Sequence, residues 1–205
     1  MERVLIGLSG GVDSAAAALL LKERGYQVTG AYCVMHSRGE RELADAKAVA
    51  HALGFPLLRL DLRRRFEDEV LHNFLSEYAA GRTPNPCVLC NPAVKFAALC
   101  ACADRYGIAR VATGHYAGVK KRYNRYSIRC NPVKDQSYML SRLPQSVLAR
   151  LELPLYGRDK ASLRDMASAA GLPVADKPDS QELCFAQGGY RQFLLERGLP
   201  VRPGR

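Results

Sequence analysis

A glycine-rich hexapeptide near the start of the chain combines two hydroxyls and a carboxylate. The apolar run Leu5–Leu8 leads into Ser9–Ser14, which reads SGGVDS, and an alanine-rich stretch follows at once. A glycine-rich turn between a strand and a helix presents backbone N–H groups and the positive end of the helix dipole, which together bind anions. The alternative is a tight turn in which Asp13 and Ser14 only cap the helix. We favour phosphate binding by this loop.

Two common nucleotide-binding patterns do not describe this loop. The G-x-x-x-x-G-K-[ST] pattern requires a lysine that Ser9–Ser14 lacks, and the dinucleotide fingerprint requires a third glycine. The sequence therefore indicates a different class of phosphate site.

Cysteines form a second chemical group. Cys87 and Cys90 are a CxxC pair inside Thr83–Asn91 (TPNPCVLCN), which we expect to be a loop just before a helix. The helix dipole would stabilise a thiolate there, and Cys90 is the better candidate for the reactive thiol. Cys184 stands in a second polar segment, Asp179–Phe185 (DSQELCF). Two thiols from distant loops indicate sulfur handling.

The remaining cysteines have a simpler interpretation. The chain has 7 cysteines in 205 residues, an odd count that is too small for a disulfide scaffold and typical of a reducing compartment. Cys100 and Cys102 lie two residues apart on an expected helix and cannot share a face, so we interpret them, with Cys33, as small core residues. A zinc site that joins them to Cys87 and Cys90 is a weaker alternative, because C-x-C within a helix is poor ligand geometry.

The charge balance favours a polyanionic partner. Lys and Arg number 30 against 20 Asp and Glu, which gives a formal net charge of +10. Basic clusters lie at Arg63–Arg65 and at Lys120–Arg122, the latter followed by Arg125. Such clusters suit nucleic acid, although a solvated basic face is the alternative. We expect no apolar run long enough to cross a bilayer and no secretory signal, and hence a cytoplasmic protein without a membrane partner.

Strand and helix patterns alternate along the chain and would position these groups. With 48% hydrophobic residues, the chain can bury a core. We expect buried parallel strands at four apolar runs: Arg3–Leu8, Gln27–Met35, Pro56–Leu60 and Arg110–Thr113. We expect helices at Ser14–Arg24, Glu40–Leu53, Arg65–Tyr78 and Ala93–Tyr106.

This order predicts an α/β fold with a doubly wound, mostly parallel sheet and a ligand site at the carboxyl ends of the strands. The pattern weakens after Tyr126–Cys130, and Ser141–Ala170 is typical of helix with proline and glycine breaks. We therefore expect a core over residues 1–140 and a helical extension over 141–205 that belongs to the same domain and carries Cys184.

Several motifs resemble those of a known family. Ser9–Ser14 resembles the pyrophosphatase loop (PP-loop) of the N-type ATP pyrophosphatases, which cleave ATP between the α and β phosphates to adenylate a substrate. This loop is followed, in the order found in bacterial tRNA-specific 2-thiouridylases, by TPNPCVLCN, GHYA (Gly114–Ala117), KDQSY (Lys134–Tyr138) and DSQELCF. The resemblance spans nearly the whole chain but only that family's N-terminal catalytic domain. We expect the family's central and C-terminal β-rich domains to be absent from this chain.

The resemblance implies ATP-dependent 2-thiolation of the wobble uridine in tRNA. ATP would adenylate the C2 oxygen with the help of Mg²⁺, and sulfur would then displace AMP. The implied partners are the anticodon loop of tRNA and a sulfur-donor protein such as a cysteine desulfurase or a relay protein, with no DNA partner.

The resemblance also implies roles for single residues. ATP would be bound by the loop and two neighbouring positions, namely Gly7, Leu8, Ser9, Gly10, Gly11, Val12, Ser14, Met35 and Gly114. Asp13 would help to position Mg²⁺, Asn85 and Pro86 would face the target base, and Lys134, Asp135 and Gln136 would contact tRNA. Cys184 would carry a persulfide sulfur, and Cys90 would attack to release it or close a disulfide afterwards.

One departure from the family affects the chemistry. Many members have an aspartate where this chain has Cys87, and that carboxylate is a candidate for acid–base assistance. Cys87 therefore joins Cys90, Cys184 and Asp13 among the candidate catalytic residues. Cys87, Cys90 and Cys184 could also hold an iron–sulfur cluster through three thiolates, with one iron open to sulfide.

Two other functions stay open. Another PP-loop adenylating ligase, of the amidotransferase or argininosuccinate synthase type, would use ATP without needing Cys90 and Cys184. A truncated relative would bind tRNA or a sulfur donor through its basic surface without turnover.

Overall fold

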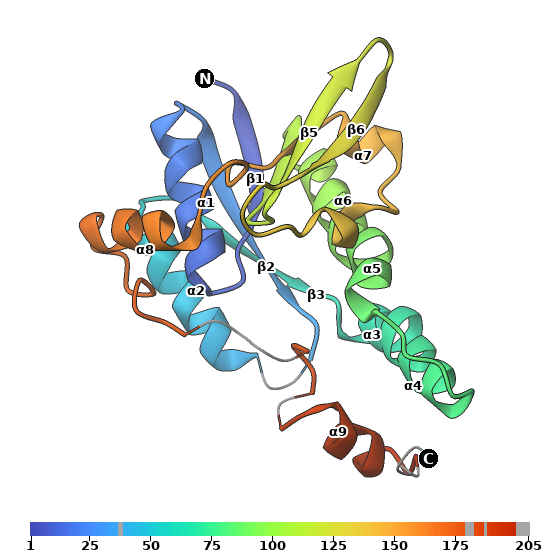
Figure 1. The fold of residues 1–205 in the computed structure, drawn as a ribbon. Helices are drawn as coiled ribbons and strands as arrows, with labels where there is room; N and C mark the ends of the chain where they lie inside the picture. Colours follow the sequence, from blue (N-terminus) through green and yellow to red (C-terminus); the bar gives the residue numbers. More distant parts are fainter. Residues whose placement is uncertain (37–38, 179–182, 187, 200–205) are drawn as a thin grey trace.

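A parallel sheet forms the centre of the molecule. The computed structural model describes residues 1–36, 39–178, 183–186 and 188–199. The sheet has five strands in the order β3-β2-β1-β4-β7, every neighbouring pair is parallel, and helices cover both faces (Figure 1). Its strands are β1 (Arg3–Gly7), β2 (Gln27–Val34), β3 (Leu57–Asp61), β4 (Arg110–Thr113) and β7 (Leu151–Glu152). The predicted α/β fold with a mostly parallel sheet is confirmed.

Helices connect the strands and extend beyond them. The helical segments are α1 (Val12–Glu23), α2 (Glu40–Ala52), α3 (Arg63–Phe66), η1 (Glu67–Leu71), α4 (His72–Ala79), α5 (Pro86–Cys90), η2 (Asn91–Phe96), α6 (Ala97–Arg105), η3 (Ser137–Leu140), α7 (Gln145–Leu148), α8 (Lys160–Ala169) and α9 (Tyr190–Glu196). The π-helical turns η1 and η2 join α3 to α4 and α5 to α6. The segment η3 is a short 3-10 helix.

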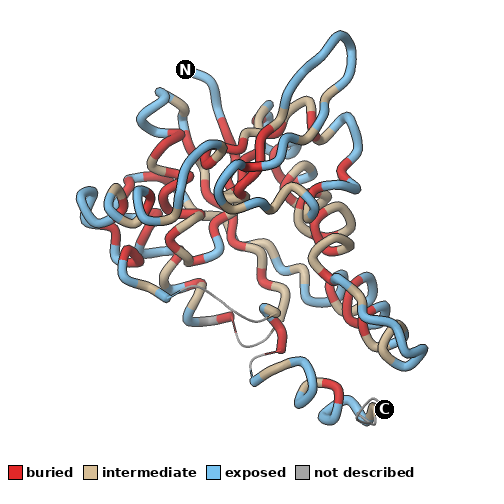
Figure 2. The backbone as a smooth tube through the Cα atoms, in the orientation of Figure 1, coloured by how far each residue is buried: buried red, intermediate tan, exposed pale blue. Residues whose placement is uncertain are grey.

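The central strands divide their side chains between two hydrophobic clusters. Val4 and Ile6 of β1 belong to a cluster with α1, α2 and α8, whereas Leu5 belongs to a second cluster with α6 and α7. Alternate residues of a strand point to opposite faces, which explains this division. The alanines of α1 are fully buried, so this helix packs closely between the sheet and α8 (Figure 2).

The helix after the CxxC segment begins earlier than predicted. We expected Ala93 as its first residue, but α5 begins at Pro86, so Cys87 and Cys90 lie in the first turns of the helix and not in a loop before it. Asn85 is the N-cap, and its side-chain oxygen accepts a hydrogen bond from the backbone N–H of Cys87 at 3.2 Å. Proline at the first helical position after an asparagine cap is a start signal that the sequence analysis missed.

The chain after β4 contains elements that the sequence analysis did not predict. Residues 117–130 form an antiparallel hairpin of β5 (Ala117–Arg122) and β6 (Arg125–Cys130). Ser141–Ala170 contains the helices α7 and α8, which are separated in the region of the predicted proline and glycine breaks. β7 lies inside that range and adds a fifth strand to the sheet through two residue pairs with β4. A strand of two residues is too short to show any hydrophobic period, so the pattern could not predict it.

One helix meets the length and hydropathy expected of a membrane span, contrary to our expectation from the sequence. This helix, Pro86–Arg105, has 20 residues and a mean hydropathy of 1.5 in its most apolar window. Its buried residues enter two hydrophobic clusters, with Val94 in one and Phe96, Leu99 and Ala103 in the other. We interpret it as a core helix, since core helices of globular domains are equally apolar.

Candidate nucleotide and thiol site

The loop after β1 is closed by its own hydroxyls. The Ser14 hydroxyl donates to the Gly11 carbonyl oxygen at 3.0 Å and accepts from the Ser9 backbone N–H at 3.1 Å. The two serine hydroxyls are also 3.1 Å apart. Gly11 is the N-cap of α1 and offers no side-chain cap, so the N–H groups of the first turn point toward the loop without a capping oxygen. This arrangement suits a bound phosphate.

Two glycines let other backbone segments approach the loop. Gly10 has φ +73°, and a Cβ atom at this position would lie 2.3 Å from the Glu42 carbonyl oxygen of α2. Gly114 follows β4, and a Cβ atom there would lie 2.9 Å from the Asp13 carbonyl oxygen and the Ser14 nitrogen. Any larger residue would push the loop away. Gly114, predicted from the resemblance to line the ATP pocket, therefore lies directly against the loop.

Asp13 lies between a tyrosine and a lysine. Its Oδ1 accepts a hydrogen bond from the Tyr116 hydroxyl at 2.7 Å and from Lys160 Nζ at 2.6 Å. Tyr116 is fully buried, whereas Asp13 and Lys160 keep partial solvent access. The side-chain orientation of Asp13 is thus set by residues from two distant segments. A single carboxylate beside a phosphate site is a usual partner of Mg²⁺, which takes its remaining ligands from phosphates and water.

A second lysine reaches the loop from the C-terminal part of the chain. Lys177 Nζ donates to the Gly10 carbonyl oxygen at 2.9 Å and pairs with the Asp45 carboxylate of α2. Lys160 and Lys177 thus place two positive charges beside the candidate phosphate site. The sequence analysis named neither of them.

The reactive thiol candidate touches the predicted nucleotide pocket. Cys90 Sγ lies 3.9 Å from Met35 Sδ, and Met35 follows the carboxyl end of β2. Cys90 is buried in a hydrophobic cluster that also contains Val94, Phe185 and Ala186. The described part of the Cys184 segment therefore packs against the helix that carries Cys90. Residues 179–182 of the predicted motif DSQELCF lie outside the described residues.

Aromatic packing joins the Cys184 segment to α3, α4 and α9. The Phe185 ring lies 5.6 Å from Phe66, 5.1 Å from Phe74 and 5.0 Å from Phe193, all in edge-on geometry. A cavity of about 360 Å³ borders the same cluster and is lined by residues that include Met35, Phe185 and Phe193. Cys184 itself is an exposed free thiol at this edge.

A lysine opposes the effect of burial on the thiols. Burial raises the pKa of Cys90 to about 12, and the positive charge of Lys95 counteracts this rise. Cys184 is exposed as a residue, but the packed atoms around its thiol still desolvate it and raise its pKa, and the charge of Lys95 again opposes this rise. Burial would by itself lower the pKa of Lys95, but the charges of Cys90, Cys184 and Cys87 raise it. Lys95 therefore lies among the thiols as their counter-charge.

An asparagine that the sequence analysis did not single out organises the helix start. Asn91 is buried, and its Nδ2 donates to the Cys87 carbonyl oxygen at 3.0 Å and to the Met139 carbonyl oxygen at 3.1 Å. Of the two residues predicted to face the target base, Asn85 is exposed and caps the helix, whereas Pro86 is buried.

The residues predicted to contact tRNA mainly shape their own loop. Asp135 accepts hydrogen bonds from the Asn131 and Ser137 backbone N–H groups and from the Ser137 hydroxyl, and the Ser137 hydroxyl is the main reason why the pKa of Asp135 is lowered. Gln136 exchanges two hydrogen bonds with the backbone of Tyr116. Lys134 Nζ lies 5.1 Å from the centre of the Tyr116 ring. Through Tyr116 this loop is linked to Asp13.

His115, which the prediction kept outside the catalytic set, is held neutral. Its Nδ1 is hydrogen-bonded to the Thr113 hydroxyl at 2.8 Å, and burial together with the charge of Lys95 lowers its pKa to about 3. A residue that stays uncharged at neutral pH supports the interpretation of a structural histidine.

The thiols do not form a ligand set for a metal in this arrangement. Among the described residues, no group of three His, Cys, Asp or Glu side chains could hold a metal ion. Cys87, Cys90 and Cys184 are all described, so an iron–sulfur cluster would require them to move closer together. The present geometry does not fit the cluster, and no chemical step is assigned to it.

Comparison with known proteins decides the family. Residues 2–188 match the family model described as "tRNA methyl transferase HUP domain". The chain belongs to this family. Among its curated relatives, a tRNA-specific 2-thiouridylase MnmA of Thermus thermophilus is 45% identical over 222 aligned positions, which cover 100% of this chain and 60% of that protein. A tRNA-specific 2-thiouridylase of Syntrophus aciditrophicus is 43% identical, with 99% of this chain and 58% of that protein covered.

The predicted resemblance to the 2-thiouridylases is thus confirmed. The chain spans about three fifths of the length of these relatives. Two solved structures share the fold of this family member. The NMN synthetase of Francisella tularensis has a TM-score of 0.56 at 18% identity and covers 97% of this chain and 78% of its own. A tRNA methyltransferase subunit of Methanocaldococcus jannaschii has a TM-score of 0.52 at 20% identity and covers 97% of this chain and 89% of its own.

Proposed function

We propose that this chain carries the active site of a cytoplasmic enzyme that uses ATP to thiolate C2 of the wobble uridine in tRNA. The observation that carries the proposal is the 3.9 Å contact between the sulfur atoms of Cys90 and Met35. This contact joins a candidate sulfur-transfer thiol to the pocket that would hold ATP. An enzyme that only adenylates its substrate does not need a reactive thiol beside its ATP pocket.

The first step is adenylation of the uridine. The C2 oxygen attacks the α-phosphorus of ATP, the bond to the β-phosphate oxygen breaks, and pyrophosphate leaves. The amides and hydroxyls of Ser9–Ser14 bind the departing phosphates, and Lys160 and Lys177 offset the developing negative charge. Asp13 would hold Mg²⁺, which would supply further charge stabilisation. Fixed dipoles and charges of this kind stabilise a phosphoryl-transfer transition state strongly, because they require no reorganisation during the reaction.

The second step transfers sulfur. The terminal sulfur of a Cys184 persulfide attacks C2, and AMP leaves with the C2 oxygen. The Cys90 thiolate then attacks the Cys184 sulfur, so that the S–S bond breaks, 2-thiouridine departs with its electron pair, and a Cys90–Cys184 disulfide forms. An external thiol reduces this disulfide before the next turnover. In the other route, Cys90 attacks the persulfide first and releases sulfide as the nucleophile.

Two macromolecular partners follow from this chemistry. A sulfur-donor protein, such as a cysteine desulfurase or a relay protein, delivers sulfur to the exposed Cys184. The tRNA presents its wobble base from the anticodon loop, where the cost of unstacking a base is lowest. The net charge of +10 suits this second partner.

Single-turnover sulfur transfer tests the proposal. Enzyme loaded with persulfide is mixed with tRNA and ATP, and both AMP and thiolated tRNA are measured. Cys184→Ser should fail to load sulfur, and Cys90→Ser should load it but fail to deliver it. Cys130→Ser is the matched control, because Cys130 is an exposed thiol outside the hydrophobic cluster of Cys90. Normal loading and delivery by both site variants would refute the thiol relay.

The same assay separates the alternatives. A PP-loop ligase with another substrate would form AMP without tRNA thiolation and would not respond to the cysteine substitutions. A binding protein without turnover would form neither product, although it would bind tRNA.

A further inference from the structure

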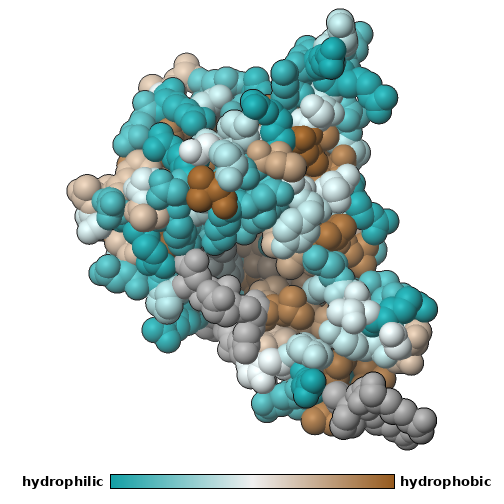
Figure 3. All heavy atoms as spheres, in the orientation of Figure 1, coloured by the Kyte–Doolittle hydropathy of each residue, from teal (hydrophilic) through white to brown (hydrophobic). Residues whose placement is uncertain are grey.

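The β5–β6 hairpin projects from the body of the protein and is strongly basic. Figure 1 shows it extending away from the central sheet, and Figure 3 shows hydrophilic side chains over its far end. Residues 117–130 contain five basic residues and no Asp or Glu. Lys120, Lys121, Arg122 and Arg125 are all exposed, and Arg122 pairs directly with Arg125 across the turn. Like charges so close together repel one another unless an anion binds there.

The other basic cluster does not share this property. Arg63 pairs with Asp61 at 2.6 Å, and Arg64 lies 3.9 Å from Asp68. Residues 61–69 also contain four acidic side chains, and these partly neutralise the charge of the three arginines. The structure therefore distinguishes two clusters that look equivalent in the sequence.

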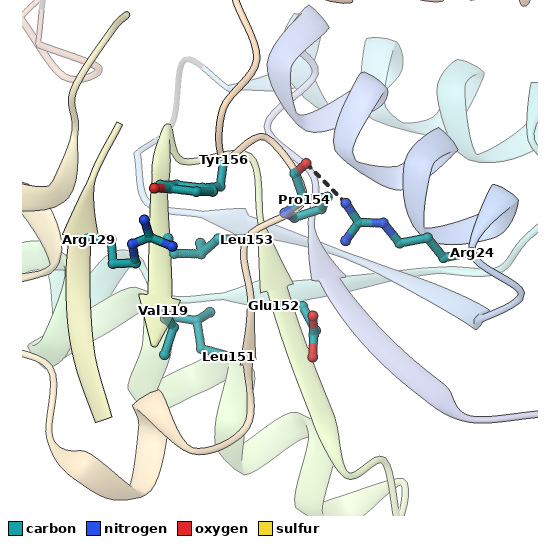
Figure 4. A pocket seen from close by; sticks show the side chains of 9 residues that line it. Arg24, Val119, Arg129, Leu151, Glu152, Leu153, Pro154 and Tyr156 are labelled. Carbon is teal, nitrogen blue, oxygen red and sulfur yellow. Dashed lines mark hydrogen bonds between the residues drawn. The ribbon is translucent and has the colours of Figure 1, made fainter. Parts of the chain in front are cut away.

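The root of the hairpin is held firmly. A Cβ atom at Gly118 would lie 2.6 Å from the Tyr156 ring, so only glycine permits this contact. Arg129 pairs with Gly118 across the hairpin, and its guanidinium lies 4.7 Å from the centre of the same Tyr156 ring, beside a pocket of about 250 Å³ (Figure 4). The Gln145 side chain exchanges two hydrogen bonds with the backbone of Tyr126. The hairpin is thus a preorganised arm, which reduces the entropy lost on binding.

The tip of the hairpin carries an unusual residue. Arg122 pairs with Arg125, so Tyr123 and Asn124 form a two-residue turn, and Tyr123 has φ +54° at a position that favours glycine. Its side chain is 85% exposed, and the Arg122 guanidinium lies 5.5 Å from its ring. A bulky residue in the left-handed region is an unfavourable choice for stability alone. An exposed tyrosine beside arginines can donate a hydrogen bond to a phosphate or ribose oxygen.

We propose that the tip of this hairpin, Lys120–Arg125, binds the phosphate backbone of the double-helical RNA stem that adjoins the modified loop. This inference rests on the proposed function, because it takes the RNA to enter at the PP-loop and the thiols. The root follows Tyr116, whose hydroxyl binds Asp13, and six residues per strand place the tip about 20 Å away. A base held beside Asp13 would therefore lie about 20 Å from the hairpin tip, far enough for the tip to contact the stem and not the loop. Charge complementarity makes a phosphate backbone the fitting occupant.

RNA binding tests this inference directly. Affinity is measured without ATP for two probes, an anticodon stem-loop RNA and the same loop sequence as a single strand. The triple variant Lys120→Gln, Lys121→Gln and Arg122→Gln should bind the stem-loop at least tenfold more weakly at about 0.1 M salt, with a salt slope lower by about two to three. Its affinity for the single strand should change less than threefold. Tyr123→Ala should weaken stem-loop binding by about three- to tenfold.

The matched control removes the same charge elsewhere. The variant Arg63→Gln, Arg64→Gln and Arg65→Gln should change stem-loop affinity less than threefold. Equal losses of stem-loop affinity in the two triple variants would mean that only net charge matters. An unchanged affinity in the hairpin variant would mean that the hairpin does not bind the stem and could serve another partner, such as an acidic protein. Either result overturns the inference. Because the assay uses no ATP or sulfur, it reports on the hairpin even if the protein does not thiolate tRNA. If the protein thiolates tRNA but the hairpin variant binds the stem-loop normally, this inference is refuted and the proposed function is not.

Discussion

Lys160 Nζ lies 2.6 Å from the same Asp13 oxygen that accepts the Tyr116 hydroxyl hydrogen bond. Asp13 and Lys160 are 147 positions apart in the sequence. The pair places a positive charge at the mouth of the PP-loop and fixes the carboxylate that would hold Mg²⁺. It therefore connects helix α8 to the candidate site at the start of α1.

Asp13→Ala should abolish AMP formation without unfolding the protein. Asp13 keeps partial solvent access in the first turn of α1, so its loss removes a ligand and not a core contact. AMP release in the presence of tRNA measures the effect, and thermal unfolding checks the fold. AMP and thiolated product at the parent rate would show that the loop is not the adenylation site.

Lys160→Met should lower the rate of AMP formation by about a hundredfold to a thousandfold, because loss of one group that stabilises transition-state charge typically costs this much. Lys47→Met is the matched control, since Lys47 is an exposed lysine on α2. Pyrophosphate release measures both variants. If the two variants release pyrophosphate at the same rate, Lys160 does not stabilise the transition state and serves only to neutralise Asp13 in the absence of ATP.

Gly114→Ala should weaken ATP binding by at least tenfold. The added methyl group would lie 2.9 Å from the backbone of Asp13 and Ser14, so the loop must move. Gly118→Ala is a steric control, because its methyl group would meet the Tyr156 ring at the hairpin root and not the loop. We expect Gly118→Ala to lower the melting temperature while the folded protein keeps its ATP affinity. Calorimetric titration with ATP separates the two effects, and normal ATP binding by Gly114→Ala would contradict the assigned pocket.

Lys95→Gln should move the sulfur-transfer step to higher pH. The thiolate is the reactive form, and burial already holds the pKa of Cys90 at about 12. Because the positive charge of Lys95 lowers this pKa, its removal raises the pKa further and reduces the thiolate fraction at any given pH. The rising limb of the single-turnover rate should therefore shift upward, whereas AMP formation should not change. Lys95→Arg keeps the charge and should largely preserve the profile.

The rate of thiol alkylation gives a second measure of this prediction. Iodoacetamide reacts with the thiolate, so Lys95→Gln should slow the alkylation of Cys184 at neutral pH. Identical pH profiles and alkylation rates in the parent and Lys95→Gln would remove Lys95 from the sulfur chemistry.

Local patterns in the sequence determined the core of this fold and the position of the loop in its candidate site. The apolar runs that became β1, β2, β3 and β4 were recognisable because a buried parallel strand is continuously apolar. The loop Ser9–Ser14 was recognisable because a strand, two glycines and a helix start lie within a few residues of one another. Both signals depend only on neighbours in the chain, and both were correctly placed.

Contacts between distant segments were decided by the tertiary structure. Lys160 and Lys177 have no local feature that marks them as partners of the loop, and only the packing of α8 on α1 brings the C-terminal segment to Asp13 and Gly10. Lys95 could have been noticed at helical spacing from Asn91, but its place among Cys87, Cys90 and Cys184 depends on the segment that carries Phe185. Sequence spacing describes which side chains share one helix or loop. Which charges meet across the molecule follows from how the helices pack on the sheet, because that packing minimises exposed apolar area over the whole chain at once.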